Sequence, residues 1–168
     1  MPPDTKDWTW VIAAGCPECG FVPRTATEVA ARTRATIPRW QAVLGRPDAP
    51  ERPSPQVWSP LEYGCHVRDV CAVFGVRARL ILTQDEPTFA NWDQDQTAIQ
   101  ERYHAQDPAD VALEYATEAE RTAEIFERVP AGAWERPGRR SNGARFTTAS
   151  LAVYFLHDLE HHLYDVAG

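Results

Sequence analysis

The chain has 168 residues and a formal net charge of −7, with 17 Lys and Arg against 24 Asp and Glu. This length predicts one domain that buries a core of its own. The acidic balance argues against a nucleic-acid partner, because phosphate backbones are bound by positively charged surfaces. No stretch approaches the roughly 20 apolar residues of a membrane span, and the first residues lack the apolar core of a signal peptide. We therefore expect a cytoplasmic protein with no membrane partner.

Residues 1–24 are predicted to form an irregular arm, because prolines and glycines interrupt them at short intervals. The arm contains a Cys-Pro-x-Cys-Gly motif with Cys16 and Cys19. This motif supplies half of a structural zinc site, which needs four ligands. Further ligands are available in Cys65, Cys71, His104 and His162. A second metal site made of Cys16, Cys19 and His162 is one interpretation; a redox motif and two ordinary thiols are the others.

Residues 25–168 are predicted to form a bundle of four helices. The second and third helices begin where Ser59 and Asp107 each precede a proline, and Thr147 or Thr148 caps the fourth. Apolar residues then recur at helical spacing in each segment. The predicted helices cover residues 25–44, 59–83, 107–129 and 147–166. Because no strand-like alternation is sustained, the sequence predicts an all-α four-helix bundle preceded by the irregular arm.

The predicted connections between these helices are long. Residues 85–106 are polar and are expected to form a loop for the most part. Trp92 in this loop is the tryptophan that we expect to border a substrate pocket. Residues 131–146 contain three glycines and leave room for an irregular turn or a short hairpin.

Two histidines four residues apart, His157 and His161, project from the same face of the last predicted helix. A third, His66, lies in the middle of the second predicted helix. Imidazoles suit zinc, nickel, iron or copper, and three protein ligands leave the open coordination position of a catalytic site. The alternative is a surface pair and a hydrogen-bonded core histidine, since spacing alone does not show that the two helix faces meet.

Two motifs surround these histidines. The segment from Trp58 to His66 follows the pattern Trp-Ser-x-x-Glu-x-x-x-His, and His157 and His161 form an HxxxH pair near the C-terminus. Together they resemble the DinB/YfiT-like superfamily of four-helix metalloproteins, over about residues 25–166. The resemblance implies that His66, His157 and His161 bind one divalent metal, for which we expect zinc or nickel.

The same resemblance suggests an activity. The superfamily includes mycothiol-dependent maleylpyruvate isomerase and bacterial thiol S-transferases, which implies a metal-dependent transferase or isomerase acting on a small electrophile. The metal would hold a low-molecular-weight thiol such as mycothiol as its nucleophilic thiolate. Two alternatives stay open: a hydrolase whose metal activates water, and a non-catalytic metal-binding or stress-response module. The sequence also leaves open whether the protein is a homodimer.

Charged residues near the histidines are candidates for supporting roles. The carboxylates that could orient the imidazoles are Asp69, Asp158, Glu160 and Asp165. Arg77 lies three helical turns after His66 on the same predicted face, and is a candidate for binding a cofactor or a substrate carboxylate. Solvated carboxylates and a salt bridge of Arg77 within the bundle are the alternatives.

Overall fold

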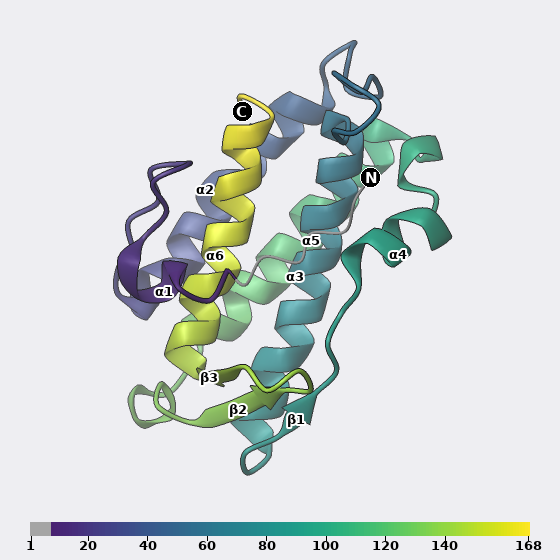
Figure 1. The fold of residues 1–168 in the computed structure, drawn as a ribbon. Coiled ribbons are helices and arrows are strands. Elements are labelled where there is room, and N and C mark those ends of the chain that lie inside the picture. The colour runs from purple at the N-terminus through teal and green to yellow at the C-terminus, as the bar shows by residue number, and fades with distance from the viewer. Residues whose placement is uncertain (1–7) are drawn as a thin grey trace.

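A computed structural model describes residues 8–168 of the chain. Four long helices form the bundle (Figure 1). They are α2 (Val29–Leu44), α3 (Pro60–Thr83), α5 (Pro108–Glu127) and α6 (Thr148–Asp165). Helix α3 packs on α5 and α6, and α2 packs on the same two helices. None of the helices in residues 8–168 is long and apolar enough to cross a membrane.

Shorter elements occupy the connections. The short helices are α1 (Val11–Ala14) and α4 (Gln94–Gln100), with 3-10 turns at Ala26–Glu28, Tyr103–Ala105 and Ala131–Ala133. The strands are β1 (Thr88–Phe89), β2 (Pro137–Arg140) and β3 (Arg145–Thr147). Helix α4 lies within the segment 85–106, which the sequence predicts to be loop for the most part. Asp93 caps this helix by accepting a hydrogen bond from the Gln96 amide.

Capping side chains start three of the four long helices, as the sequence predicts. Ser59 and Glu62 form a reciprocal capping box at α3, and Asp107 accepts backbone hydrogen bonds at the start of α5. Thr147 and Ser150 form the corresponding box at α6. At the start of α2, by contrast, the Thr25 hydroxyl donates to the Glu28 carboxylate, and no side chain caps the backbone.

The small sheet makes the all-α prediction inexact. Strand β1 pairs in parallel with β2, and β2 pairs antiparallel with β3. The β2–β3 hairpin forms in the connection where the sequence leaves room for a short hairpin. Strand β1 lies in the segment 85–106, which is predicted to be loop for the most part. Gly138 permits the sheet to pack on α3, since a Cβ there would lie 2.6 Å from Ile81. The pairing joins segments about 50 residues apart, a contact that local periodicity does not reveal.

The core fills the space between the helices and continues under the arm. Its largest fully buried side chains include Trp40, Tyr115, Phe126 and Phe155, and each such burial stabilises the fold by roughly 1.5–3 kcal/mol. Val11 and Phe21 of the arm belong to the same buried cluster. The described part of the arm, from residue 8, therefore packs on the bundle, and residues 1–7 of the predicted arm lie outside the described residues.

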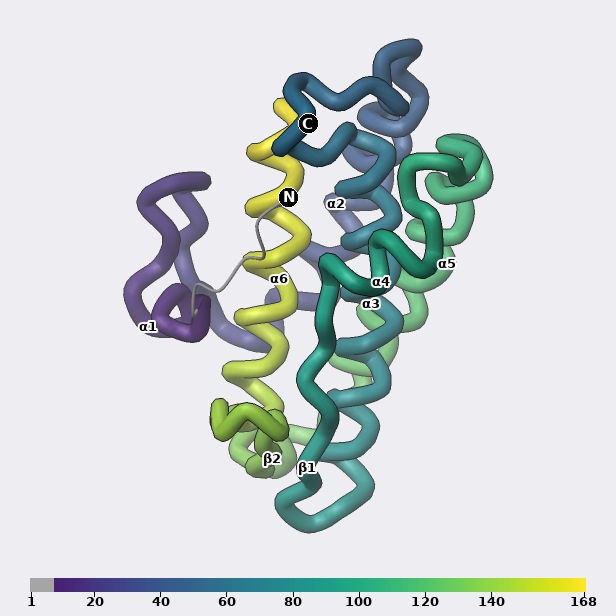
Figure 2. Tube along the Cα trace, turned by 45° about the vertical axis from the view of Figure 1, so that its right-hand side comes forward, coloured from purple at the N-terminus to yellow at the C-terminus, as the bar shows by residue number. Residues whose placement is uncertain are grey.

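Helix α6 lies between the arm and α3. The arm, with α1, runs along one side of α6, and α3 packs on another side (Figure 1, Figure 2). Side chains from adjacent faces of α6 therefore meet different partners.

Candidate metal centres

Helix α6 carries two pairs of donor residues, offset by one position. His157 and His161 form one pair four residues apart, and Asp158 and His162 form the other. Successive residues of an α-helix are rotated by about 100°, so the two pairs lie on adjacent faces of α6. Each pair belongs to a different group of potential metal ligands.

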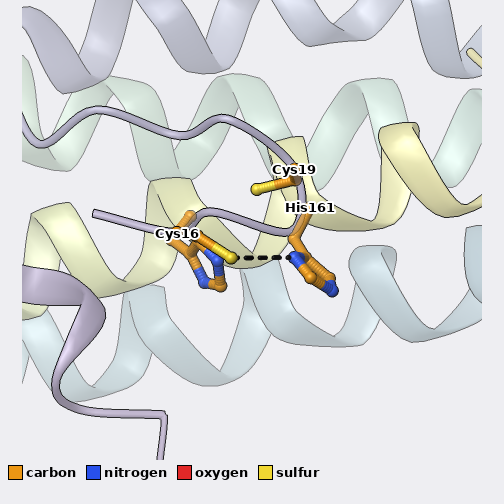
Figure 3. Close-up of side chains that lie close together, drawn as sticks. Cys16, Cys19 and His161 are labelled. Carbon is orange, nitrogen blue, oxygen red and sulfur yellow. Dashed lines mark hydrogen bonds between the residues drawn. The ribbon is translucent and has the colours of Figure 1, made fainter. Parts of the chain in front are cut away.

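The first group, which we call the cysteine group, consists of Cys16, Cys19, His157 and His161. One ligand atom from each residue lies within 4.8 Å of the others. Cys16 Sγ lies 3.7 Å from His161 Nδ1, and Figure 3 shows both cysteine side chains beside His161. All but the half-buried Cys19 are buried. The group therefore contains two sulfur and two nitrogen donors, and three of its four residues are buried.

The second group, which we call the carboxylate group, consists of His66, Asp158 and His162. Asp158 Oδ1 lies 3.2 Å from His66 Nε2 and 3.4 Å from His162 Nε2. On the other side of the ring, His162 Nδ1 lies 2.8 Å from Asp165 Oδ2. One carboxylate oxygen thus lies close to two imidazole nitrogens from different helices. The Asp165 carboxylate contacts the opposite nitrogen of the His162 ring.

A cavity of about 250 Å³ borders both groups. Trp8, Trp58, Tyr63 and Tyr154 line it, together with Asp158 and His162 of the carboxylate group and His157 and His161 of the cysteine group. His66 is fully buried, and the ring of Trp92 stacks on it with centroids 5.4 Å apart and planes 2° apart. Trp92 thus covers the histidine, while other aromatic residues border the cavity itself.

Burial and neighbouring charges set the protonation of both groups. Burial by itself would raise the pKa of Asp158, but its hydrogen bond with His66 and the nearby imidazoles lower that pKa to about 2. Burial, with the neighbouring His161, lowers the pKa of His157 to about 4. Burial raises the pKa of Cys19 to about 11. At neutral pH, Asp158 is therefore a carboxylate and His157 is a neutral imidazole, the forms in which these residues bind metals.

The structure divides the three histidines of the sequence prediction between the two groups. His66 lies in the carboxylate group, whereas His157 and His161 lie with the cysteines. His162, which the sequence interpretation joined to Cys16 and Cys19, lies with His66 instead. Sequence reasoning treated Asp158 as a supporting residue and so missed it as a ligand candidate. The sequence contains a signal for it, because Asp158 and His162 form a second pair four residues apart, within the same six residues as His157 and His161.

The other candidate residues have varied partners. Asp165 contacts His162, as a supporting carboxylate should, and lies 3.8 Å from His161. Asp69 instead accepts hydrogen bonds from Tyr103 and Arg68. Glu160 forms a two-bond ion pair with Arg32 of α2.

Arg77 is buried away from the cavity. Its guanidinium donates to the Ala90 carbonyl at 3.0 Å and lies over the rings of Phe74 and Phe89. Burial, together with the charge of Arg140, lowers the pKa of Arg77 to about 10. The described contacts give Arg77 a role in packing the end of α3 against β1.

The chain is similar to known proteins both in fold and in sequence profile. Among curated proteins, none matches the chain. The fold is similar to that of YfiT from Bacillus subtilis, described as a probable metal-dependent hydrolase with an unusual four-helix bundle topology. The TM-score is 0.70 at 14% sequence identity, over 84% of this chain and 83% of YfiT. Residues 48–166 match the sequence profile of the DinB superfamily, and the chain therefore belongs to that superfamily.

Proposed function

We propose that the chain is a metal-dependent hydrolase of small molecules, with a divalent ion held by His66, Asp158 and His162. The observation that carries this proposal is the approach of two imidazole nitrogens to one carboxylate oxygen beside a cavity. Two histidines and a carboxylate are a common ligand set of catalytic zinc and of iron. Three protein ligands leave coordination positions for water and substrate.

The hydrogen-bond pattern of His162 fits a bound cation. Its Nδ1 approaches Asp165 and its Nε2 approaches Asp158. A neutral imidazole carries a proton on only one nitrogen, so one of these contacts sets a lone pair against a carboxylate. Either a second ring proton or a cation bound to Nε2 removes this conflict. Metal analysis distinguishes the two.

The residues around the group prepare it for catalysis. When bound, a divalent ion polarises a carbonyl and lowers the pKa of its water to about 7. Asp165 fixes the tautomer and the orientation of the His162 ring. Trp58 and Trp92 pack against His66, at centroid distances of 5.5 and 5.4 Å, and exclude water from that histidine.

The cavity size supports a small substrate, and the likeness to YfiT supports hydrolysis. A volume of about 250 Å³ lies below the usual range for drug-sized ligands, roughly 300–1,000 Å³. YfiT, whose fold the chain shares, is described as a probable metal-dependent hydrolase. Because one fold hosts many reactions, this likeness supports the reaction class and does not identify a substrate.

A second candidate is thiol transfer or isomerisation of a small electrophile. The cavity of about 250 Å³ lies beside the proposed metal and has room there for a small electrophile. The resemblance to mycothiol-dependent isomerases and thiol S-transferases supports this candidate, with zinc or nickel as the metal. The nucleophile then distinguishes the two reactions: water in the first and a low-molecular-weight thiol in the second.

Metal analysis and turnover test the proposal. Protein purified without a histidine tag should contain a divalent metal, and it should hydrolyse small nitrophenyl esters or amides. Mycothiol or N-acetylcysteine, added with a chloronitrobenzene, tests the second candidate. The variant Asp158→Ala should lose the metal of the carboxylate group and the activity.

The matched control is His104→Ala, which removes an exposed histidine that lies in neither ligand group. This variant should retain both metal and activity. A protein that binds metal at the carboxylate group but turns over neither class of substrate would identify a non-catalytic module and overturn the proposal.

A further inference from the structure

The turn that carries Cys16 and Cys19 is held in shape by its own backbone. The Gly20 amide donates to the Cys16 carbonyl at 2.8 Å, and the Cys16 amide donates to the Phe21 carbonyl at 2.9 Å. Gly20 has a φ of +74°, a conformation that glycine adopts without steric cost. One short turn therefore presents both cysteine side chains to α6 (Figure 3).

Helix α6 presents the matching nitrogen donors. His157 and His161 are four residues apart on one helix face, with ring centroids 5.0 Å apart. His157 Nε2 is buried and has no hydrogen-bond partner among the described residues. A buried polar nitrogen of this kind is unfavourable unless something binds it. The orphaned nitrogen lies on a residue of the cysteine group, whose four ligand atoms all lie within 4.8 Å of one another.

We propose that Cys16, Cys19, His157 and His161 bind a structural zinc ion, at a site separate from the carboxylate group. Two thiolates and two imidazoles in tetrahedral arrangement are a standard ligand set for structural zinc. Binding releases the two thiol protons to solvent, and no electron transfer is involved. Because the protein supplies all four ligands, the site leaves no position for a substrate and has a structural role.

The zinc site links the arm to the wall of the cavity. Trp8 precedes the cysteine turn, and its ring lies 5.8 Å from His157 and 5.1 Å from His161. Trp8 also borders the cavity beside the carboxylate group. Zinc binding therefore fixes the part of the arm that closes one side of the cavity. The DinB profile begins at residue 48, so the cysteine turn lies outside the matched segment.

Cobalt substitution tests this site by a readout that does not depend on activity. Cobalt bound to two thiolates should give a thiolate-to-metal charge-transfer band, which the carboxylate group cannot produce. We expect this band in the wild-type protein and in Asp158→Ala, and its loss in the double variant Cys16→Ser, Cys19→Ser. The matched control Cys65→Ser removes a buried cysteine outside both groups and should retain the band.

Thiol alkylation of the wild-type protein provides a test that needs no variant. With zinc bound, Cys16 and Cys19 should react with a maleimide at least tenfold more slowly than after removal of zinc by a chelator. Peptide mapping identifies which cysteines have reacted. Equal reaction rates with and without zinc, or a wild-type protein without the charge-transfer band, would overturn the proposal.

The two proposals fail in different ways. Loss of one equivalent of metal in Cys16→Ser, Cys19→Ser, with the other equivalent retained, supports the zinc site whatever the activity. Absence of metal from the carboxylate group would remove the proposed hydrolase and leave the zinc site standing. A double variant that still holds two equivalents of metal contradicts the zinc site alone.

Discussion

The cysteine group and the carboxylate group share one helix yet differ in the kind and the number of their donors. The cysteine group has four donors, two of them sulfur, and the arm supplies half of the set. The carboxylate group has three donors, oxygen and nitrogen only, and both groups border the same cavity. On α6 both groups use residues four apart. The partner that meets each face, an arm with cysteines or a helix with one histidine, therefore decides the chemistry.

The comparison also separates stability from reactivity. A closed sulfur and nitrogen site contributes its binding free energy to folding, and here it would join segments from the two ends of the chain. An open site with a carboxylate exposes coordination positions to a substrate. Because both groups take ligands from α6, the rigid packing of that helix positions the donors of both groups.

Removal of a ligand from the carboxylate group should have the largest effect. His162→Ala deletes one of three donors, and we expect it to lower metal affinity at that group by more than 100-fold. In the cobalt-substituted variant, the charge-transfer band of the cysteine group should persist. Isothermal titration with zinc or nickel measures the affinity, with His104→Ala as control. Loss of both metals together would show that the two groups are one site.

Zinc at the cysteine group should stabilise the fold. At a hundredfold excess over its Kd, a ligand that binds only the folded state stabilises it by about 2.7 kcal/mol. This corresponds to a rise in Tm of about 5–10 °C for a domain of this size. Thermal unfolding with and without zinc should show this rise in the wild type, and a smaller one in Cys16→Ser, Cys19→Ser. An equal rise in both proteins contradicts a structural role.

Asp165→Asn should weaken the carboxylate group without removing a ligand. The asparagine amide is uncharged and holds the His162 ring less firmly than the carboxylate does. We therefore expect metal affinity at the carboxylate group to fall by about 10- to 100-fold. Glu160→Gln is the matched control, because Glu160 is on the same helix but pairs with Arg32. Metal titration of the two variants measures the difference. A similar loss in the control would indicate a general effect of α6 charge.

Glu62→Gln should destabilise the start of α3, which carries His66, and spare the arm. Burial by itself would raise the pKa of Glu62, but hydrogen bonds from Arg52 and the Ser59 amide lower it below its usual value. The ionised carboxylate therefore stabilises the fold above about pH 4.5, and this contribution is lost as pH falls through the lowered pKa. We expect a cost of about 1.5 kcal/mol at pH 7.

Urea unfolding at several pH values checks this dependence. The difference between wild type and Glu62→Gln should be largest near neutral pH and should decrease below pH 4.5. A difference that does not change with pH would show that the variant loses packing rather than a charged hydrogen bond.

Much of the helical framework could be predicted, because its signals are local. Ser59 with Pro60, and Asp107 with Pro108, mark helix starts that the structure contains. The segment from Trp58 to His66 also pointed to the DinB superfamily, to which the chain belongs. The sheet could not be predicted in the same way. Strand β1 has only two residues, and it is stabilised by pairing with a hairpin some 50 residues later.

The donors of α6 show where prediction from sequence ends. The spacing of His157, Asp158, His161 and His162 by itself determines which side chains share a helix face, because helical periodicity is a local property. Only the tertiary structure decides which face meets His66 and which meets the cysteines. That choice depends on the rotation of α6 about its axis, which is set when Leu156, Leu159 and Leu163 are buried against distant parts of the chain.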